Sequence, residues 1–294
     1  MSKRRNNPRA ASAAPKREKV RDIFVARPFE GLADETEWIA LRELVPAASA
    51  PLTLKPEIIE EYGDRPVTLS TVLPMAWPAM TRQDGRIFVG LQRHIQSGDV
   101  SRDVAVAVLN ALQTEPGGTV PVPALPGEGP RLQDILADGP LDVTVHDGFE
   151  YWLDAQQAED PSVKASLERA NASIYPTVRM TAAHAAYWCR VPEKSHVRWV
   201  LPEPEDTALD ALARLSASGD LLLGEGTKFA GMFRAHGLLV PVWDLPHDLE
   251  AGDWEAPLAD FAKRYSDILA ETGPLDAAAR RAKQGLVGRQ LTLR

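Results

Sequence analysis

Two glycine-rich turns are the residues of this 294-residue chain best suited to bind a ligand. Gly127-Glu128-Gly129 is followed closely by Arg131, and Gly224-Glu225-Gly226 is followed by Lys228. Each turn stands between a predicted strand and a predicted short helix. A glycine-rich turn that opens a helix can direct free backbone N–H groups at an anion, and the helix dipole adds attraction. The turns are therefore candidate anion-binding sites.

The same turns also have a purely structural interpretation. Glycine permits tight turns, and a cation in the first turn of a helix is unfavourable unless an anion is present. No Lys-Ser or Lys-Thr pair follows a glycine at P-loop spacing, which argues against a nucleoside triphosphatase. Both interpretations remain open at this point.

Residue patterns typical of catalytic or metal sites are missing from the sequence. The six histidines are scattered, and no Gly-x-Ser-x-Gly motif occurs. The single Cys189 follows Trp188 in an apolar run, where a buried thiol is usually inert. One cysteine cannot form an intrachain disulfide or a multi-cysteine zinc site. We predict no catalytic residue, no metal site and no cofactor.

The charge of the chain is divided between a basic start and an acidic remainder. The net charge is −8, but the first 21 residues hold eight cationic side chains against Glu18, which leaves −15 for the rest. Few large apolar residues occur there, so we predict a disordered tail over residues 1–22. Such a tail attracts RNA or the ribosome, or it only improves solubility. Its cationic residues are Lys3, Arg4, Arg5, Arg9, Lys16, Arg17, Lys19 and Arg21.

Hydropathy and cysteine content bear on the compartment. No apolar run reaches the roughly 18 residues of a membrane span, and the basic start lacks the apolar stretch of a secretory signal. A single cysteine suits a reducing environment. We therefore expect a soluble, cytoplasmic protein with no membrane association.

The glycine turns belong to two segments that look like an internal duplication. Each segment has two β-type runs around a turn, at 82–85 in the first and 192–195 in the second. A capped helix follows, over 101–112 or 206–215, and then a short strand, over 119–122 or 221–223. After the Gly-Glu-Gly turn each segment continues into a second short helix and a final strand. The predicted order is ββαβαβ in both.

Further helices are predicted outside these segments. One begins after Asp34 with Glu37 placed as in a capping box and ends at Pro46. Two more cover 161–172 and 253–271, whereas 284–293 is either an edge strand or a frayed tail. The fold class is α/β, α+β in detail, with two tandem pseudo-symmetric repeats. The predicted parts are a tail (1–22), a first repeat (23–150), a helical linker (151–173), a second repeat (174–247) and a C-terminal helix and tail (248–294).

Several motifs resemble a known family. Arg27-Pro28-Phe29-Glu30-Gly31-Leu32, Leu73-Pro74-Met75-Ala76-Trp77-Pro78 and the run from Phe233 to Leu245 are similar to an uncharacterised actinobacterial family, a domain of unknown function. The likeness spans nearly the whole chain and implies a bacterial cytoplasmic setting. Some lookalikes are labelled SecA-type preprotein translocase or topoisomerase, but this chain lacks a P-loop and a cysteine-rich zinc motif. A weaker, fold-level similarity is to the SseB-type N-terminal domain.

Two functional hypotheses follow. In the first, the protein is a non-enzymatic binding or regulatory protein whose body contacts a protein partner and whose tail holds it on nucleic acid or the ribosome. In the second, it is a small enzyme or an anion sensor acting between the repeats. That site would use Glu128, Arg131, Glu225 and Lys228.

Overall fold

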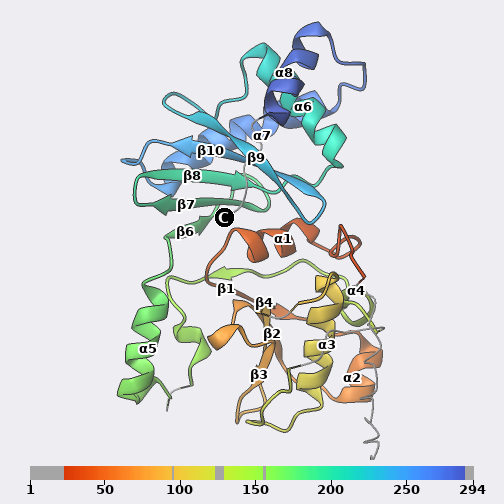
Figure 1. Ribbon diagram of the computed structural model, residues 1–294, viewed down its shortest axis with the longest axis vertical. Helices are drawn as coiled ribbons and strands as arrows, with labels where there is room; N and C mark the ends of the chain where they lie inside the picture. Colours follow the sequence, from red (N-terminus) through yellow and green to blue (C-terminus); the bar gives the residue numbers. More distant parts are fainter. Residues whose placement is uncertain (1–22, 95, 123–128, 155–156, 289–294) are drawn as a thin grey trace, which may run out of the picture.

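Two five-stranded sheets, one above the other, dominate the structure (Figure 1). This computed structural model describes residues 23–94, 96–122, 129–154 and 157–288. The tail predicted as disordered, and Gly127 and Glu128 of the first turn, lie outside the described residues. The mixed α+β class is confirmed.

The first sheet contains one parallel strand pair, β2 with β4, and is otherwise antiparallel. The second sheet is antiparallel throughout. In spatial order the first sheet comprises β3 (Ala79–Thr81), β4 (Ile87–Gln92), β2 (Val67–Val72), β1 (Ala48–Leu52) and β5 (Thr144–Val145). The second comprises β6 (Thr177–Arg179), β7 (Ala186–Val191), β8 (Lys194–Trp199), β10 (Leu238–Leu245) and β9 (Lys228–Ala235).

Eight α-helices surround and separate the sheets in the described chain. Their sequences place apolar residues at helical spacing, as in the buried stripe Leu209, Leu212 and Leu215 of α6. Gly219 ends α6 in the left-handed region, as its C-terminal position predicts. The helices are α1 (Glu35–Glu43), α2 (Pro56–Tyr62), α3 (Val100–Leu112), α4 (Leu132–Ile135), α5 (Pro161–Asn171), α6 (Glu205–Ser218), α7 (Glu255–Leu269) and α8 (Ala277–Val287). None of these helices has the length and apolarity needed to cross a membrane.

The predicted first hairpin is wrong in its pairing. The turn at 82–85 joins β3 to β4, whereas β2, the β-branched run, lies parallel to β4 on its other side. The second hairpin, β7 with β8, is confirmed. Since the two sheets differ in strand order and direction, the structure does not show an internal duplication.

Four further predictions of secondary structure are corrected. Residues 119–122 form no strand, because Pro121 and Pro123 lack the N–H that a ladder needs. Residues 221–223 form no strand either, and the second glycine turn opens β9 instead of a helix. The burial of β9 follows strand alternation at several positions, from Phe229 to Ala235. The C-terminal segment forms α8 rather than a strand or a frayed end up to Val287.

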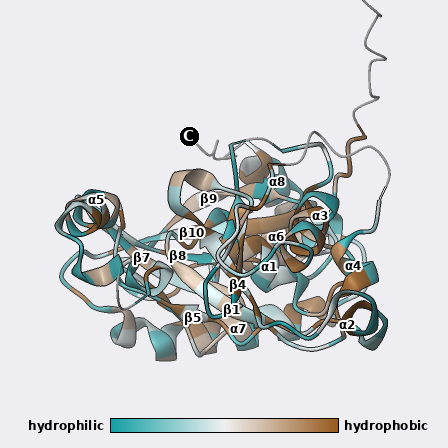
Figure 2. Ribbon diagram, turned by 90° about the horizontal axis from the view of Figure 1, so that it is seen from below, coloured by the Kyte–Doolittle hydropathy of each residue, from teal (hydrophilic) through white to brown (hydrophobic). Residues whose placement is uncertain are grey.

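Helix α1 lies between the two sheets and is buried on all sides (Figure 1). Six consecutive residues, 36–41, are buried, although a surface helix buries only one stripe. One apolar cluster joins α1 and the first sheet to Tyr187, Val240 and Val242 on the inner face of the second sheet. The outer face packs on α6, α7 and α8 through residues such as Trp243. Viewed from below, α3 is mostly hydrophobic, whereas many peripheral loops are hydrophilic (Figure 2).

Glu37 connects α1 to the second sheet instead of capping its own helix. Its side chain is 0% exposed; Oε1 accepts from Arg179 Nη2 at 2.7 Å, and Oε2 accepts from Tyr187 Oη at 2.6 Å. Burial, together with the charge of Glu37, raises the pKa of Tyr187. Asp34 makes no side-chain cap; it accepts from the backbone N of Leu141 at 2.7 Å. Both acids therefore bridge distant segments.

We expect Glu37→Gln to lower the free energy of unfolding by about 3 kcal/mol, because it leaves a charged guanidinium without its buried partner. Urea unfolding followed by tryptophan fluorescence measures the change. The matched control is Glu30→Gln, at a residue whose side chain is 66% exposed and pairs with Arg27. Its effect is expected within about 0.5 kcal/mol. Equal midpoints for the two variants would contradict the role given to Glu37.

Candidate functional site

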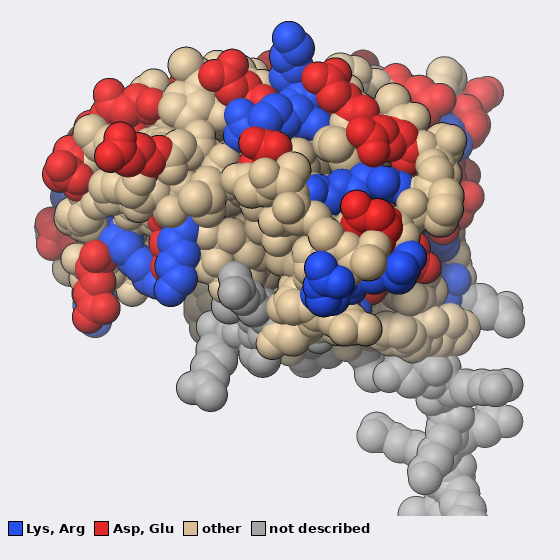
Figure 3. Space-filling view, turned by 90° about the horizontal axis from the view of Figure 1, so that it is seen from above, with Lys and Arg blue, Asp and Glu red and all other residues tan. Residues whose placement is uncertain are grey.

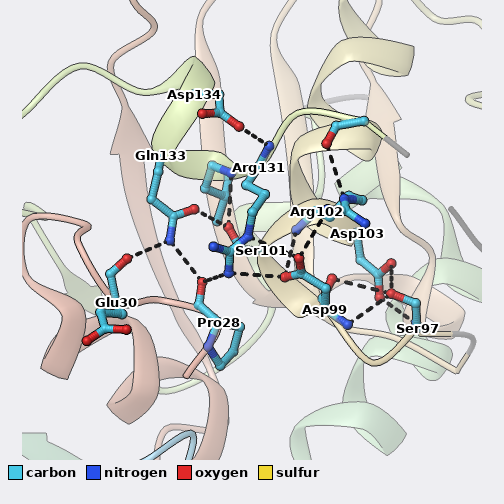
Figure 4. A network of polar contacts seen from close by, with 12 residues as sticks. Pro28, Glu30, Ser97, Asp99, Ser101, Arg102, Asp103, Arg131, Gln133 and Asp134 are labelled. Atoms are coloured by element: carbon cyan, nitrogen blue, oxygen red, sulfur yellow. Dashed lines mark hydrogen bonds and ion pairs between the residues drawn. The ribbon is translucent and has the colours of Figure 1, made fainter. Parts of the chain in front are cut away.

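Arg131 of the first glycine turn is engaged in the protein interior (Figure 4). It precedes the four-residue helix α4, and its Nε lies 3.0 Å from Oδ2 of Asp99, whose side chain is 2% exposed. Its Nη2 donates to the carbonyl of Pro28 at 2.8 Å. These contacts hold the segment around Pro28, α3 and α4 together and pair the guanidinium of Arg131 within the fold.

Neighbouring polar groups in Figure 4 also satisfy one another. Ser101 Oγ donates to Gln133 Oε1 at 2.6 Å and accepts from the backbone N of Leu132 at 3.0 Å. The amide of Gln133 donates to the carbonyls of Pro28 and Glu30. This network is a connector between segments, consistent with the structural interpretation of the first turn.

The second glycine turn is closed on itself. Thr227 Oγ1 donates to the carbonyl of Gly224 at 2.7 Å and accepts from its N–H at 3.2 Å. Gly226 adopts a φ of +76°, which favours glycine, and Lys228 is the first residue of β9. Because no helix begins here, there is no helix dipole to attract an anion to this turn.

The two turns do not share a site. Arg131 contacts Pro28, and the neighbouring Phe29 packs on His236 at the far end of β9 from Lys228. Eight strand residues at about 3.3 Å each separate the ends of β9 by more than 20 Å. A site built jointly from Arg131 and Lys228 is therefore not formed.

A different cavity, of about 180 Å³, lies between the sheets. Glu43 at the end of α1 and Gln92 of β4 line it from one side, and Thr177, Cys189 and Arg198 of the second sheet line it from the other. Alternation along β7 and β8 puts Cys189 and Arg198 on the inner face of their sheet, beside the region that α1 covers.

Arg198 brings an uncompensated positive charge to this cavity. Its Nη2 donates to Cys189 Sγ at 2.9 Å, and no carboxylate of the described chain pairs with it. Burial raises the pKa of the Cys189 thiol, although Arg198 opposes this shift, so the sulfur is neutral near pH 7 and cannot balance the guanidinium. Burial and the charge of Arg198 also lower the pKa of His196 nearby.

Glu43, the one acidic residue lining the cavity, is already balanced. Its Oε1 lies 2.8 Å from His236 Nε2 and 3.3 Å from Arg42 Nε. Burial alone would raise the pKa of Glu43, but the hydrogen bond and charge of His236, with the charge of Arg42, outweigh it and lower that pKa. Glu43 is therefore ionised and neutralised near pH 7, and the positive charge of Arg198 remains unmatched.

Comparison with known families adds one assignment. A family model described as a family of unknown function, DUF5926, matches residues 28–294. The chain belongs to the DUF5926 family. No curated protein and no solved structure matches it. The expected membership of a domain of unknown function is thereby confirmed, and a functional assignment for this DUF5926 protein has to come from its own geometry.

The DUF5926 chain also contains a serine–histidine pair that sequence motifs did not reveal. Ser49 Oγ lies 2.8 Å from His146 Nε2, and burial lowers the pKa of His146, which suits a proton acceptor. Tyr151 stacks on the imidazole at 4.1 Å. Within the described residues no carboxylate pairs with His146, so the orienting third group of a triad is missing. The pair acts as a connector between β1 and the 144–152 segment.

Metal ligands do not gather in the part of the chain that the structure describes. No group of three or more His, Cys, Asp or Glu side chains there has the geometry to hold a metal ion. The cavity beside Arg198 is the candidate site. Only one feature of this site could be read from neighbouring residues in the sequence. The alternation of residues 194–199 places Arg198 on a face, but the approach of α1 and β4 to that face is a tertiary contact.

The lowered pKa of Glu43 predicts a specific acid sensitivity. Its stabilising contribution is complete above the ordinary carboxyl pKa of about 4.3 and is lost as pH falls through the lower folded value. Between about pH 5 and pH 3 the wild type should thus lose stability more steeply than Glu43→Gln. Urea midpoints across this range measure it, with Glu57→Gln on exposed α2 as the control. Parallel curves for wild type and Glu43→Gln would refute the assignment.

Proposed function

We propose that this DUF5926 protein is a non-enzymatic, cytoplasmic binding protein that takes a small anion, a carboxylate or a phosphate, into the cavity beside Arg198. The observation that carries this proposal is the charge of Arg198, with which no carboxylate among the described residues forms an ion pair. A planar guanidinium binds carboxylate and phosphate in a bidentate manner. An anion would therefore gain a strong partner there.

The remaining lining groups support the same class of ligand. Thr177 and Gln92 provide a hydroxyl and an amide that can hydrogen-bond to anion oxygens, and Tyr175 adds a phenol at the rim. The cavity volume of about 180 Å³ is below the roughly 300 Å³ at which sites for larger organic ligands begin. Its location between two sheets gives the ligand contact with both, so binding would stabilise their association.

The sequence suggested an anion site at the glycine turns, and we propose this cavity as its location instead. In the turns, Arg131 is paired with Asp99, and the groups around Gly224 bond to Thr227. The cation of the first turn is thus paired, and Lys228 of the second turn is exposed at the start of β9, where no helix begins. Arg198, in contrast, lines a cavity.

Thermal unfolding with inorganic phosphate, citrate or acetate, each compared with chloride at equal ionic strength, tests the site. A ligand present at 100 times its Kd stabilises the folded state by about 2.7 kcal/mol, a rise of several degrees in Tm. Arg198→Gln should abolish the rise. Arg190→Gln, on the same hairpin but paired with Glu250, should keep it. A rise that survives in Arg198→Gln, or no rise with any of the three anions, would rule the cavity out as their site.

A second function, RNA or ribosome binding by the basic tail, is proposed on separate grounds. Eight cationic residues lie among the first 21, whereas the body is acidic. On the face seen in Figure 3, basic and acidic side chains are interspersed and form no continuous basic area. Phosphate contacts on that face would thus be opposed by neighbouring acids, and the tail is the better source of attraction.

Deleting residues 1–21 should abolish sedimentation with ribosomes and binding to single-stranded RNA. For the full chain, log K should fall with log salt with a slope of up to about −6 if all eight cations contact phosphate. A tail of scrambled order but unchanged composition is the control and should bind equally, because the attraction depends on charge. If the truncated and full-length proteins bind alike, the tail is not the binding element.

A further inference from the structure

A second cavity, of about 220 Å³, lies on the first-sheet side of the molecule. Met75, Trp77, Pro78 and Val122 form largely apolar walls, and Arg93 also lines it. The rim is apolar as well: Met75 is 80% exposed and Val122 is 49% exposed. Exposed apolar side chains grouped around a hollow are typical of an interaction surface.

The backbone of this wall is held in an unusual conformation. Met75 and Ala76, in the short 3-10 turn Pro74–Ala76, both have positive φ, 54° and 50°, which side-chain-bearing residues rarely adopt. Hydrogen bonds from Ala76 N to the carbonyl of Leu73 and from Trp77 N to that of Pro74 fix the turn. A Cβ on Gly90 would come within 2.7 Å of the Trp77 carbonyl, so glycine permits the close approach. Strain of this kind is found at ligand-binding sites.

Arg93 supplies the guanidinium of the cavity, which the exposed His94 also lines. Its Nη2 is buried without a hydrogen bond, and no carboxylate of the described residues forms an ion pair with it. Burial lowers the pKa of Arg93 to about 10, so it remains charged near pH 7. The acid that favours its charge, Asp103, already accepts from both the N–H and the hydroxyl of Ser97. A partly buried cation with an unsatisfied donor favours a partner that arrives from outside.

We propose that this cavity binds the C-terminal end of a partner polypeptide, with the last apolar side chain inside and the terminal carboxylate on Arg93. A volume of 220 Å³ suits a single side chain better than a large organic ligand. The exposed rim at Met75 and Val122 gives apolar contact beyond the cavity, as a continuing chain requires. An arginine fork matches the two oxygens of a carboxylate.

This site is independent of the anion cavity. The two cavities share no lining residue, since Gln92 lines one and Arg93 lines the other. It also specifies which part of a protein partner the body of the chain would bind, namely its C-terminal residue. Failure of either proposal leaves the other intact.

Fluorescence polarisation with labelled hexapeptides tests the proposal on the full-length protein. The peptides end in leucine, valine, phenylalanine or methionine after a glycine-serine spacer, with a free or an amidated C-terminus. N-acetyl-leucine serves as an unlabelled competitor that represents a small carboxylate. We expect at least one free-acid peptide to bind and its amide to bind at least tenfold more weakly.

Variants then locate the binding. Arg93→Gln should weaken the free-acid peptide at least tenfold, whereas Arg86→Gln, 49% exposed on the nearby β3–β4 turn, and Arg198→Gln should not. Met75→Gly removes rim contact while relieving the positive φ, so it should weaken binding several-fold and leave Tm unchanged or higher. The proposal would be overturned if no peptide binds, or if the free acid and its amide bind equally. It would also be overturned if both Arg93→Gln and Met75→Gly bind the peptide as the wild type does, or if N-acetyl-leucine competes as strongly as the unlabelled peptide.

Discussion

The burial of α1 between two sheets is the constraint on which the arrangement of the molecule depends. Apolar contact supplies most of the attraction, but it is non-directional. Glu37 adds direction, because a carboxylate removed from water is costly unless its oxygens are bonded. Arg179 and Tyr187 meet that need from the second sheet. Among the possible positions of the two sheets relative to α1, the position that gives the Glu37 carboxylate both hydrogen bonds is strongly favoured.

The same packing creates the cavity beside Arg198, for which we propose an anion as ligand. A nine-residue helix is about 13 Å long, whereas strands of six to eight residues extend about 20–26 Å. Helix α1 therefore cannot cover the whole inner face of the second sheet. Where it covers that face, the sheet presents Val240 and Val242, and beyond its end the sheet presents Cys189 and Arg198. The polar residues of the cavity thus lie where the covering helix ends.

Local features of this fold were predictable from the sequence, and tertiary ones were not. The hairpin of β7 and β8 and the left-handed Gly219 follow from residues within a few positions of each other. The parallel pairing of β2 with β4 was not predictable in this way, because the turn at 82–85 joins β4 to β3 and indicates only that pair. Glu37 fitted a capping box, yet its partner is 142 residues away, at Arg179. The residues around Arg198 were missed for the same reason, since alternation identifies a face but not what approaches it.

Four partly buried arginines of the described chain differ in what balances their charges. Arg131 and Arg179 are bonded to carboxylates that are almost wholly buried, so their charges are balanced within the fold. Arg93 and Arg198 have no such carboxylate among the described residues, and each lines a cavity. A charged group that has no partner inside the fold costs stability. An external anion would balance the charges of Arg93 and Arg198, and on this ground we propose that each of them binds a ligand.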